Sequence, residues 1–141
     1  MRRTGQVRVA RPAVAKPDKP VPFRKDVDTA LQDVAAKKAA YSIKFETDWC
    51  VPCKQMAELV FTAKDVADAA DGLICLIVDG DARKDLTEKH QVKGYPTGIL
   101  FDVSSKEIAR YTGYQSVKET TAFFQKAKQL SKSVETTAGL R

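Results

Sequence analysis

The first clear hydrophobic pattern along the chain has a helical period and begins at residue 27. Apolar side chains recur there at intervals of three and four residues, which places them on one face of a helix. These positions are Val27, Ala30, Leu31, Val34 and Ala35. Asp26 stands where a helix N-cap is expected, because a short acidic side chain accepts a bond from the free N–H groups of the first turn. The pattern predicts a helix over 27–39.

Four segments have the apolar pattern of β-strands. "YSIKF" (41–45) alternates apolar and polar residues, whereas "LICLIV" (73–78) is continuously apolar, as expected of a strand covered on both faces. "GILF" (98–101) and "EIARYT" (107–112) are separated by the turn "VSSK". This short connection predicts an antiparallel hairpin, because a parallel pair needs a longer crossover.

Helical spacing between the strands predicts further helices. One begins at Val51, with Cys50 in the cap position and apolar residues along one face. A second piece follows the capping-box pattern of Thr62 and Asp65 and ends near Gly72.

Two more helices are expected in the second half of the chain. Asp81 is placed to cap a short helix over 82–90. The closing helix begins after a capping box formed by Ser116 and Glu119. Its apolar face consists of Phe123, Ala127, Leu130 and Val134.

The order of these elements defines an α/β chain with a central mixed sheet of four strands, or five if Val21–Phe23 adds a short one. Helices flank the sheet, and the C-terminal hairpin and helix complete it. We expect one domain over 23–135 and a frayed end over 136–141. The chain has 141 residues, of which 43% are hydrophobic, so it can build a core without a stapling disulfide.

Residues 1–22 lack these patterns and form a basic, proline-rich tail. Residues 1–25 contain eight basic residues and one acidic residue, whereas 26–141 contain 16 basic and 17 acidic residues. The tail holds too little apolar surface to offset the entropy of folding. We interpret it as a flexible tether, with a basic arm for acidic lipid or nucleic acid as the alternative. Because the excess charge is confined there, we expect no nucleic-acid partner for the domain.

The stretch "TDWCVPCKQM" places Cys50 and Cys53 three positions apart at the end of a strand. If Cys50 caps the helix that starts at Val51, this spacing stacks both sulfurs on one side of the first turn, within reach of a disulfide. Free N–H groups and the helix dipole then stabilise a thiolate on Cys50. Cys53 shares a side with Met56 and points inward. We therefore expect Cys50 to be the exposed nucleophile and Cys53 the resolving thiol.

A metal site at the cysteine pair would need two further ligands, for which Cys75 and His90 are the obvious candidates. Cys75 lies within the apolar run and is expected to be a small buried hydrophobe. His90 stands near a helix end, where we expect a solvated side chain. No second close pair of ligands is present, so we expect no metal.

Three motifs resemble the thioredoxin superfamily, and the resemblance covers residues 23 to 131. "DWCVPCK" follows a strand, "VKGYPTGILFD" comes about forty residues later, and "YTGY" precedes the last helix. The chain is most similar to the thioredoxin-like domains of thiol:disulfide interchange proteins. The resemblance implies a thioredoxin fold and a redox-active cysteine pair that needs no other cofactor.

The resemblance also implies a substrate surface around the cysteines. Pro96 is expected to be a cis proline beside them, with the backbone of Tyr95 pairing to an extended substrate segment. Trp49 and Pro52 complete this surface. The alternative for Trp49 is a core aromatic residue. Tyr95 is larger than the residue often found in the superfamily, so its ring is expected to narrow the groove or to select partners.

One departure from the thioredoxin pattern lies six residues before Cys50. Thioredoxins commonly carry a buried aspartate there, whereas this chain has Lys44. Glu46 follows two positions later on the same face of the strand. We expect Lys44 and Glu46 to form a partly buried pair that tunes the thiols. The alternative is that both side chains are solvated.

These features together predict a thiol:disulfide oxidoreductase that exchanges disulfides with protein substrates or partner dithiols. A separate redox partner would regenerate the cysteine pair, and we expect a monomer. The alternative is a non-catalytic module of the same fold, tethered by its basic tail. As written, the sequence shows no signal segment or membrane span, which predicts a soluble cytoplasmic protein. A trimmed part of a longer protein could instead work in the periplasm.

Overall fold

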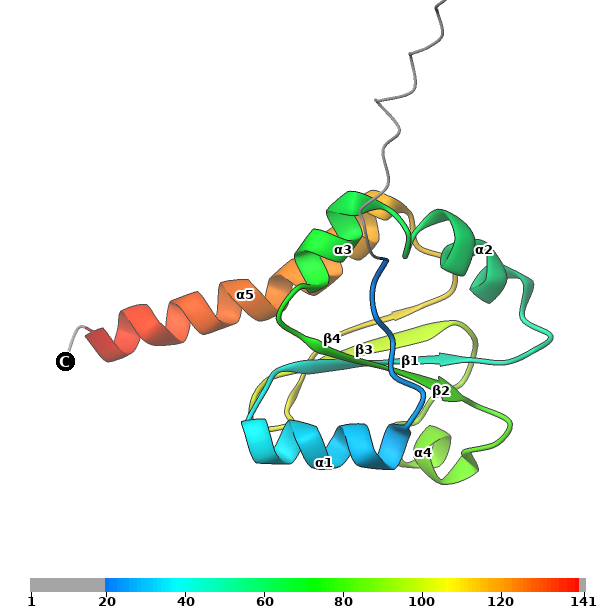
Figure 1. The fold of residues 1–141 in the computed structure, drawn as a ribbon, viewed down its shortest axis with the longest axis horizontal. Helices are drawn as coiled ribbons and strands as arrows, with labels where there is room; N and C mark the ends of the chain where they lie inside the picture. Colours follow the sequence, from blue (N-terminus) through cyan, green and yellow to red (C-terminus); the bar gives the residue numbers. More distant parts are fainter. Residues whose placement is uncertain (1–19, 140–141) are drawn as a thin grey trace, which may run out of the picture.

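The computed structural model describes residues 20–139, and it describes side chains as far as residue 129. The tail expected over 1–22 therefore lies almost wholly outside the described residues. The elements are α1 (Val27–Lys37), β1 (Tyr41–Glu46), α2 (Val51–Leu59), α3 (Lys64–Ala70), β2 (Ile74–Asp79), α4 (Lys84–Lys89), β3 (Thr97–Phe101), β4 (Glu107–Thr112) and α5 (Val117–Gly139). Helices α1 and α4 cover one face of the sheet, and α2, α3 and α5 cover the other (Figure 1). This arrangement confirms the predicted fold class.

The four strands lie in the order β2-β1-β3-β4. The central strand β1 runs parallel to β2 and antiparallel to β3, and β3 and β4 form the predicted antiparallel hairpin. Strand β2 is at an edge, but Arg24 covers part of it. The amide of Arg24 donates to the carbonyl of Cys75 (2.8 Å), and its carbonyl accepts from Ile77 (3.0 Å). The expected fifth strand is therefore a single bridge between Arg24 and Leu76 rather than a strand over 21–23.

The packed part of the chain begins at or before Val21. This side chain is buried, and its amide donates to the carbonyl of Phe61 at 3.1 Å. At the other end, α5 continues to Gly139, past the expected domain end at 135. The predicted apolar positions Leu130 and Val134 lie outside the residues whose side chains are described.

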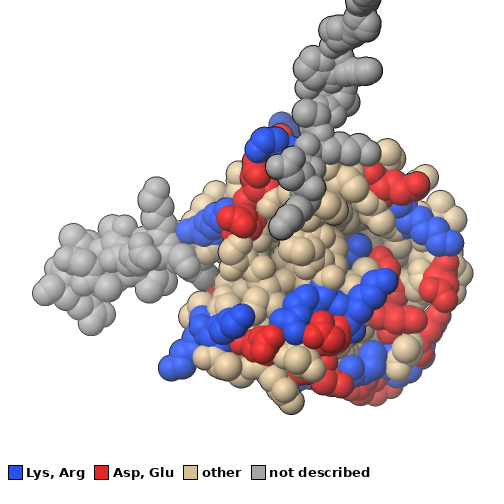
Figure 2. Space-filling model, viewed as in Figure 1, with Lys and Arg blue, Asp and Glu red and all other residues tan. Residues whose placement is uncertain are grey.

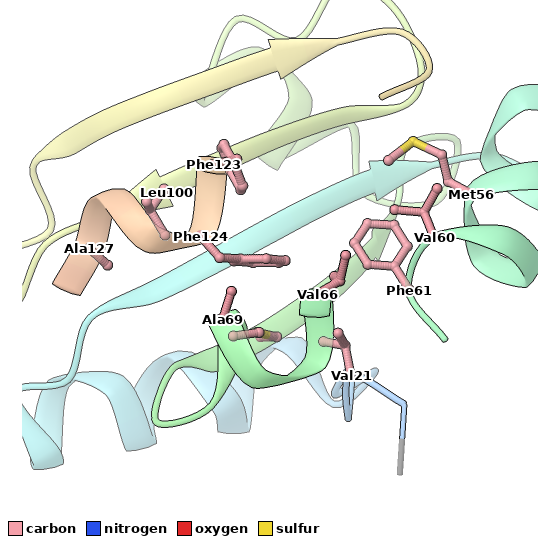
Figure 3. Packing of buried hydrophobic residues seen from close by; sticks show 12 residues of the cluster. Val21, Met56, Val60, Phe61, Val66, Ala69, Leu100, Phe123, Phe124 and Ala127 are labelled. Carbon is pink, nitrogen blue, oxygen red and sulfur yellow. The ribbon is translucent and has the colours of Figure 1, made fainter. Parts of the chain in front are cut away.

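Two apolar clusters fill the spaces on either side of the sheet. The cluster beneath α2, α3 and α5 joins Met56, Val66 and Phe124 to Leu100 of β3 (Figure 3). The other cluster packs α1 against the remaining face of β1. Because successive side chains of a strand point to opposite faces, Ser42 and Lys44 face the α2 side. The site geometry depends on this alternation.

Three of the predicted helix caps are wrong, each because the side chain has a tertiary or local competitor. Asp26 precedes α1 but makes no cap bond, since the Arg24 guanidinium binds it and holds the pKa of its carboxyl below the usual value. Thr62 bonds back to the carbonyl of Glu58, and α3 begins two residues later. Asp81 accepts a bond from Trp49 instead of capping α4.

The predicted N-caps of α2, next to the cysteine pair, and of α5, the last helix, are confirmed. Cys50 occupies the N-cap of α2, where its sulfur accepts a bond from the amide of Cys53. Ser116 and Glu119 form a reciprocal capping box ahead of α5. The Ser116 amide donates to the Glu119 carboxylate at 2.9 Å, and the Glu119 amide donates to the Ser116 hydroxyl at 3.1 Å.

Candidate active site

The candidate site lies where β1 ends and α2 begins. Cys50 and Cys53 are joined by a disulfide, and their Cα atoms are 5.3 Å apart. The amide of Cys50 donates to the carbonyl of Thr47 at 3.3 Å, which closes the turn after the strand. Pro52 lies in the first turn of α2, where its missing N–H costs no helix bond. The strand and the helix therefore position both sulfurs at the first turn.

The two sulfurs have different surroundings, although both cysteines are buried. The sulfur of Cys50 accepts the Cys53 N–H at 3.2 Å, so it lies among the free amides of the helix end. Cys53 lies on the same side of α2 as the fully buried Met56. The expectation of an exposed Cys50 is wrong for this disulfide form, since Cys50 and Cys53 are each only 3% exposed. In this form the sulfur of Cys50 is bonded to the sulfur of Cys53 and accepts the Cys53 amide.

Exposed apolar side chains flank the buried disulfide. Trp49 is 66% exposed and Val51 is 61% exposed, which excludes a core role for Trp49. The indole N–H of Trp49 donates to the Asp81 carboxylate at 3.0 Å. The ring of Tyr95 meets the Trp49 ring at a centroid distance of 5.8 Å and an interplanar angle of 89°. These two contacts hold the Trp49 indole, although most of it is exposed to solvent.

The peptide between Tyr95 and Pro96 is cis, as the resemblance implies. Pro96 is buried, and its carbonyl accepts from the amide of Gly113 at 2.8 Å. Strand β3 begins directly after it, with Thr97 paired to Phe45 of β1. The Tyr95 ring then links this segment to Trp49. The structure thus brings together the sequence segments that hold the predicted site residues.

Lys44 is buried beneath α2 rather than solvated. The residue is 4% exposed, and its ammonium nitrogen lies 3.3 Å from the carboxylate of Glu46. The same nitrogen lies 4.4 Å from the ring centre of Phe23 and 4.3 Å from that of Phe61. Burial lowers the pKa of Lys44, and the negative charge of Glu46 opposes this shift. The predicted ion pair therefore exists, with Glu46 as its more exposed partner.

Sequence reasoning missed the aromatic residues that surround this ion pair. Tyr111 of β4 pairs with Gly98, which in turn pairs with Lys44. Any side chain at Gly98 would overlap the Tyr111 ring, so the ring lies flat across β3 towards the ion pair. Burial, followed by the nearby charge of Glu46, raises the pKa of Tyr111. The alternation of "EIARYT" could have assigned Tyr111 to this face, but no sequence spacing indicates the contacts of Phe23.

The two further candidate metal ligands are packed in different places. Cys75 is buried as expected, and burial raises the pKa of its thiol to about 11. His90 is partly buried rather than fully solvated, with its ring centre 5.3 Å from that of Phe101 and 6.1 Å from that of Phe45. Within residues 20–129, no group of three or more ligating side chains could hold a metal ion.

The surface charge and the hydropathy of the helices bear on possible nucleic-acid and membrane contacts of the described residues. Basic and acidic side chains are interspersed on the face of the domain that Figure 2 shows. None of the helices within residues 20–139 is both long enough and apolar enough to cross a bilayer.

The four-stranded mixed sheet with helices on both faces, and a disulfide between Cys50 and Cys53 at the first turn of α2, define a thioredoxin fold with a Cys-x-x-Cys pair. The sequence pattern of the Thioredoxin family matches residues 23–127, and the chain belongs to that family.

Curated relatives and solved structures agree with this assignment. DsbD of Cronobacter sakazakii, a thiol:disulfide interchange protein, is 36% identical over 95 residues, which are 63% of this chain and 16% of that protein. Protein disulfide isomerase-like 2-2 of Oryza sativa is 32% identical over 81 residues, 57% of this chain and 22% of that protein. The chain thus spans about a fifth of the length of these relatives.

Similar folds are found among solved structures. A thioredoxin from Thermus thermophilus has a TM-score of 0.65 at 18% identity, with 80% of this chain and 88% of that chain covered. The oxidised C-terminal domain of Neisseria meningitidis DsbD has a TM-score of 0.61 at 14% identity, with 74% and 98% covered. At these identities, the two structures show the fold alone.

The buried position of Lys44 predicts a pH-dependent contribution to stability. A lysine whose folded pKa lies below its unfolded value binds fewer protons in the folded state, so its stability contribution rises with pH between those two values. We expect the free energy of unfolding of the wild type, relative to Lys44→Met, to increase as the pH rises from 7 towards 10. Urea titrations of both proteins across this range measure the difference. A difference that is constant with pH would contradict the burial of the ammonium group.

Proposed function

We propose that this chain exchanges disulfides with protein substrates or partner dithiols through Cys50 and Cys53. The observation that supports this most directly is the disulfide at the first turn of α2, where the two sulfurs have unequal surroundings. The DsbD and disulfide-isomerase relatives have names that describe the same chemistry. The redox centre is the cysteine pair itself, so the proposal invokes no prosthetic group.

In the reducing direction, the thiolate of Cys50 attacks one sulfur of a substrate disulfide. A mixed disulfide forms and the other substrate sulfur leaves as a thiolate. Cys53 loses its proton and attacks the sulfur of Cys50, which closes the Cys50–Cys53 disulfide and releases the second substrate thiolate. Two electrons pass from the cysteine pair to the substrate, and the released thiolates take up protons. The oxidising direction is the reverse sequence.

The proposed roles of the two sulfurs follow from their positions. A thiolate at Cys50 would keep the bond from the Cys53 amide and would lie at the positive end of the nine-residue helix α2. Cys53 lies in the first turn of α2, on the same side as the buried Met56, and is proposed to react second. Reduction breaks the bond that helps to enclose Cys50, and attack then proceeds from the side flanked by Trp49.

We propose that the substrate surface consists of Trp49, Pro52, Tyr95 and Pro96. Trp49 and Val51 offer exposed apolar area next to the sulfurs. The Tyr95–Pro96 segment lies beside them and leads into β3, so an extended substrate chain could pair with its backbone. A protein disulfide in an extended loop fits this surface better than a small rigid ligand does.

We also propose that Lys44 and Glu46 tune the titration of Cys53. A cation beneath α2 favours a thiolate in the helix above it, and low polarity strengthens this effect. Phe23, Phe61 and Tyr111 supply the low polarity around the ammonium group. Glu46 opposes the cation, so the net influence depends on how much water reaches the carboxylate.

A separate reductase or oxidase is proposed to regenerate the cysteine pair. The chain is proposed to act as a monomer. Light scattering after size-exclusion chromatography measures its mass, and a dimer mass would contradict that part of the proposal.

The enzymatic proposal predicts reduction of insulin in the presence of dithiothreitol. We expect the wild type to accelerate insulin precipitation and Cys50→Ser to leave it at the uncatalysed rate, because the serine hydroxyl cannot form the mixed disulfide. Cys75→Ser serves as a matched control, since this buried thiol lies outside the proposed chemistry. Wild-type activity equal to that of Cys50→Ser would contradict the enzymatic proposal and favour the alternative, a non-catalytic module of the same fold.

The tuning proposal predicts a shift in the thiolate absorbance of Cys53. In a Cys50→Ser, Cys75→Ser background only Cys53 titrates as a thiol, and removal of the buried cation by Lys44→Met should move its absorbance curve to higher pH. Lys118→Met removes an exposed charge of α5 and should leave the curve in place. An unchanged curve in Lys44→Met would remove Lys44 from the chemistry.

A further inference from the structure

Gly80, in the loop after β2, lies directly against the ring of Tyr95. A Cβ atom placed on Gly80 would lie within 2.5 Å of Tyr95 Cε1 and Cζ and closer still to the hydroxyl oxygen. Its φ angle is not in the left-handed region, so the backbone conformation does not call for glycine. A side chain at position 80 would therefore disturb the contact with Tyr95 rather than the local backbone.

The backbone on the Gly80 side of this contact is held by hydrogen bonds, so the end of the Tyr95 side chain is the part that would have to move. The amide of Gly80 donates to the carbonyl of Glu46 at 2.8 Å, and the next amide, that of Asp81, donates to the Asp79 carboxylate at 2.9 Å. On the other side, Tyr95 precedes the buried Pro96. The ring of Tyr95 packs against the apolar cluster on the α1 side of the sheet, away from α2. Its position on Gly80 therefore keeps the ring to one side of the cysteine pair.

The same loop also holds Trp49. Asp81 accepts the indole N–H at 3.0 Å, and the Tyr95 ring meets the indole at 89°. Trp49 therefore contacts two neighbours, Asp81, which follows Gly80 in the chain, and the Tyr95 ring, which lies against Gly80. These are the contacts that hold an indole that is 66% exposed beside the disulfide.

We propose that Gly80 is a positioning residue for protein substrates: its missing side chain leaves room for the Tyr95 ring, and this place of the ring, its seat, sets the contact between Tyr95 and the exposed Trp49 indole next to the cysteine pair. This inference rests on the proposed function and extends it to substrate choice. With a side chain at position 80, the Tyr95 ring has to leave its place, which changes its contact with Trp49 and the surface proposed to meet an extended substrate chain. Small disulfides reach Cys50 without using that surface, so they should be affected much less.

The test compares Gly80→Ala with Gly94→Ala. An added Cβ at Gly94 meets only Thr112 Cγ2 at 3.4 Å, an ordinary contact, so this variant controls for the loss of a glycine in the same region. For Gly80→Ala we expect the KM for insulin to rise about tenfold, which corresponds to about 1.4 kcal/mol of lost substrate binding. Turnover of hydroxyethyl disulfide should stay within about twofold of wild type. The variant loses only contacts to parts of a substrate that lie away from the reacting sulfurs, and this small disulfide has few such parts.

Two further measurements separate the seat from a general loss of stability. Trp49 is the only tryptophan, so its emission reports the indole environment directly. We expect Gly80→Ala to shift this emission and Gly94→Ala to leave it unchanged. Adding Tyr95→Ala to Gly80→Ala removes the overlap, so the double variant should match Tyr95→Ala alone in emission and in insulin KM. If Gly80→Ala does not fold, refolding of the double variant supports the seat, and failure of the double variant contradicts it.

Several outcomes would overturn the inference. If Gly80→Ala has wild-type emission and a wild-type KM for insulin, the missing side chain at position 80 does not determine how Tyr95 and Trp49 are placed. Equal losses for insulin and hydroxyethyl disulfide, or the same losses in Gly94→Ala, would assign the effect to the scaffold. If the wild type turns over neither substrate, the proposed function fails, but the emission of Gly80→Ala still decides whether the seat positions Trp49.

Discussion

The site depends on one constraint, the placement of Cys50 as the N-cap of α2 directly after the central strand. Strand β1 ends at Glu46, the turn closes through the bond from the Cys50 amide to Thr47, and the helix begins with the Cys53 amide directed at the sulfur of Cys50. Because β1 pairs on both sides, this end of the chain is held firmly. The unequal surroundings of the two sulfurs follow from this single arrangement.

The neighbouring elements act on that arrangement from two directions. Beneath α2, Lys44 contributes a cation that the rings of Phe23 and Phe61 keep from water. Beside the cysteines, the loop after β2 holds Trp49 through Asp81 and seats Tyr95 on Gly80. In the proposed function, the first set of contacts affects the titration of the thiols, and the second affects the approach of a substrate.

Local patterns predicted the elements, the helix position of Cys50 and the Ser116–Glu119 box, because each depends on residues within one turn. These local patterns failed where a residue far away in the sequence determines the contacts of a side chain. Asp81 was assigned to a cap but is bound by Trp49, 32 positions away, and His90 was expected in water but packs against Phe101. The aromatic surroundings of Lys44 and the seat at Gly80 are contacts between separate elements, which sequence spacing does not encode.

The account's central claim is that Cys50 attacks and Cys53 resolves, and trapping of the mixed disulfide tests it most directly. Reduced Cys53→Ser and reduced Cys50→Ser, each also carrying Cys75→Ser, are mixed with a peptide disulfide and analysed by intact-mass spectrometry. We predict rapid, stable addition of one peptide to Cys50 in the Cys53→Ser protein, because no resolving thiol remains, and little addition to the Cys50→Ser protein. Faster addition to Cys53 than to Cys50 would contradict the account.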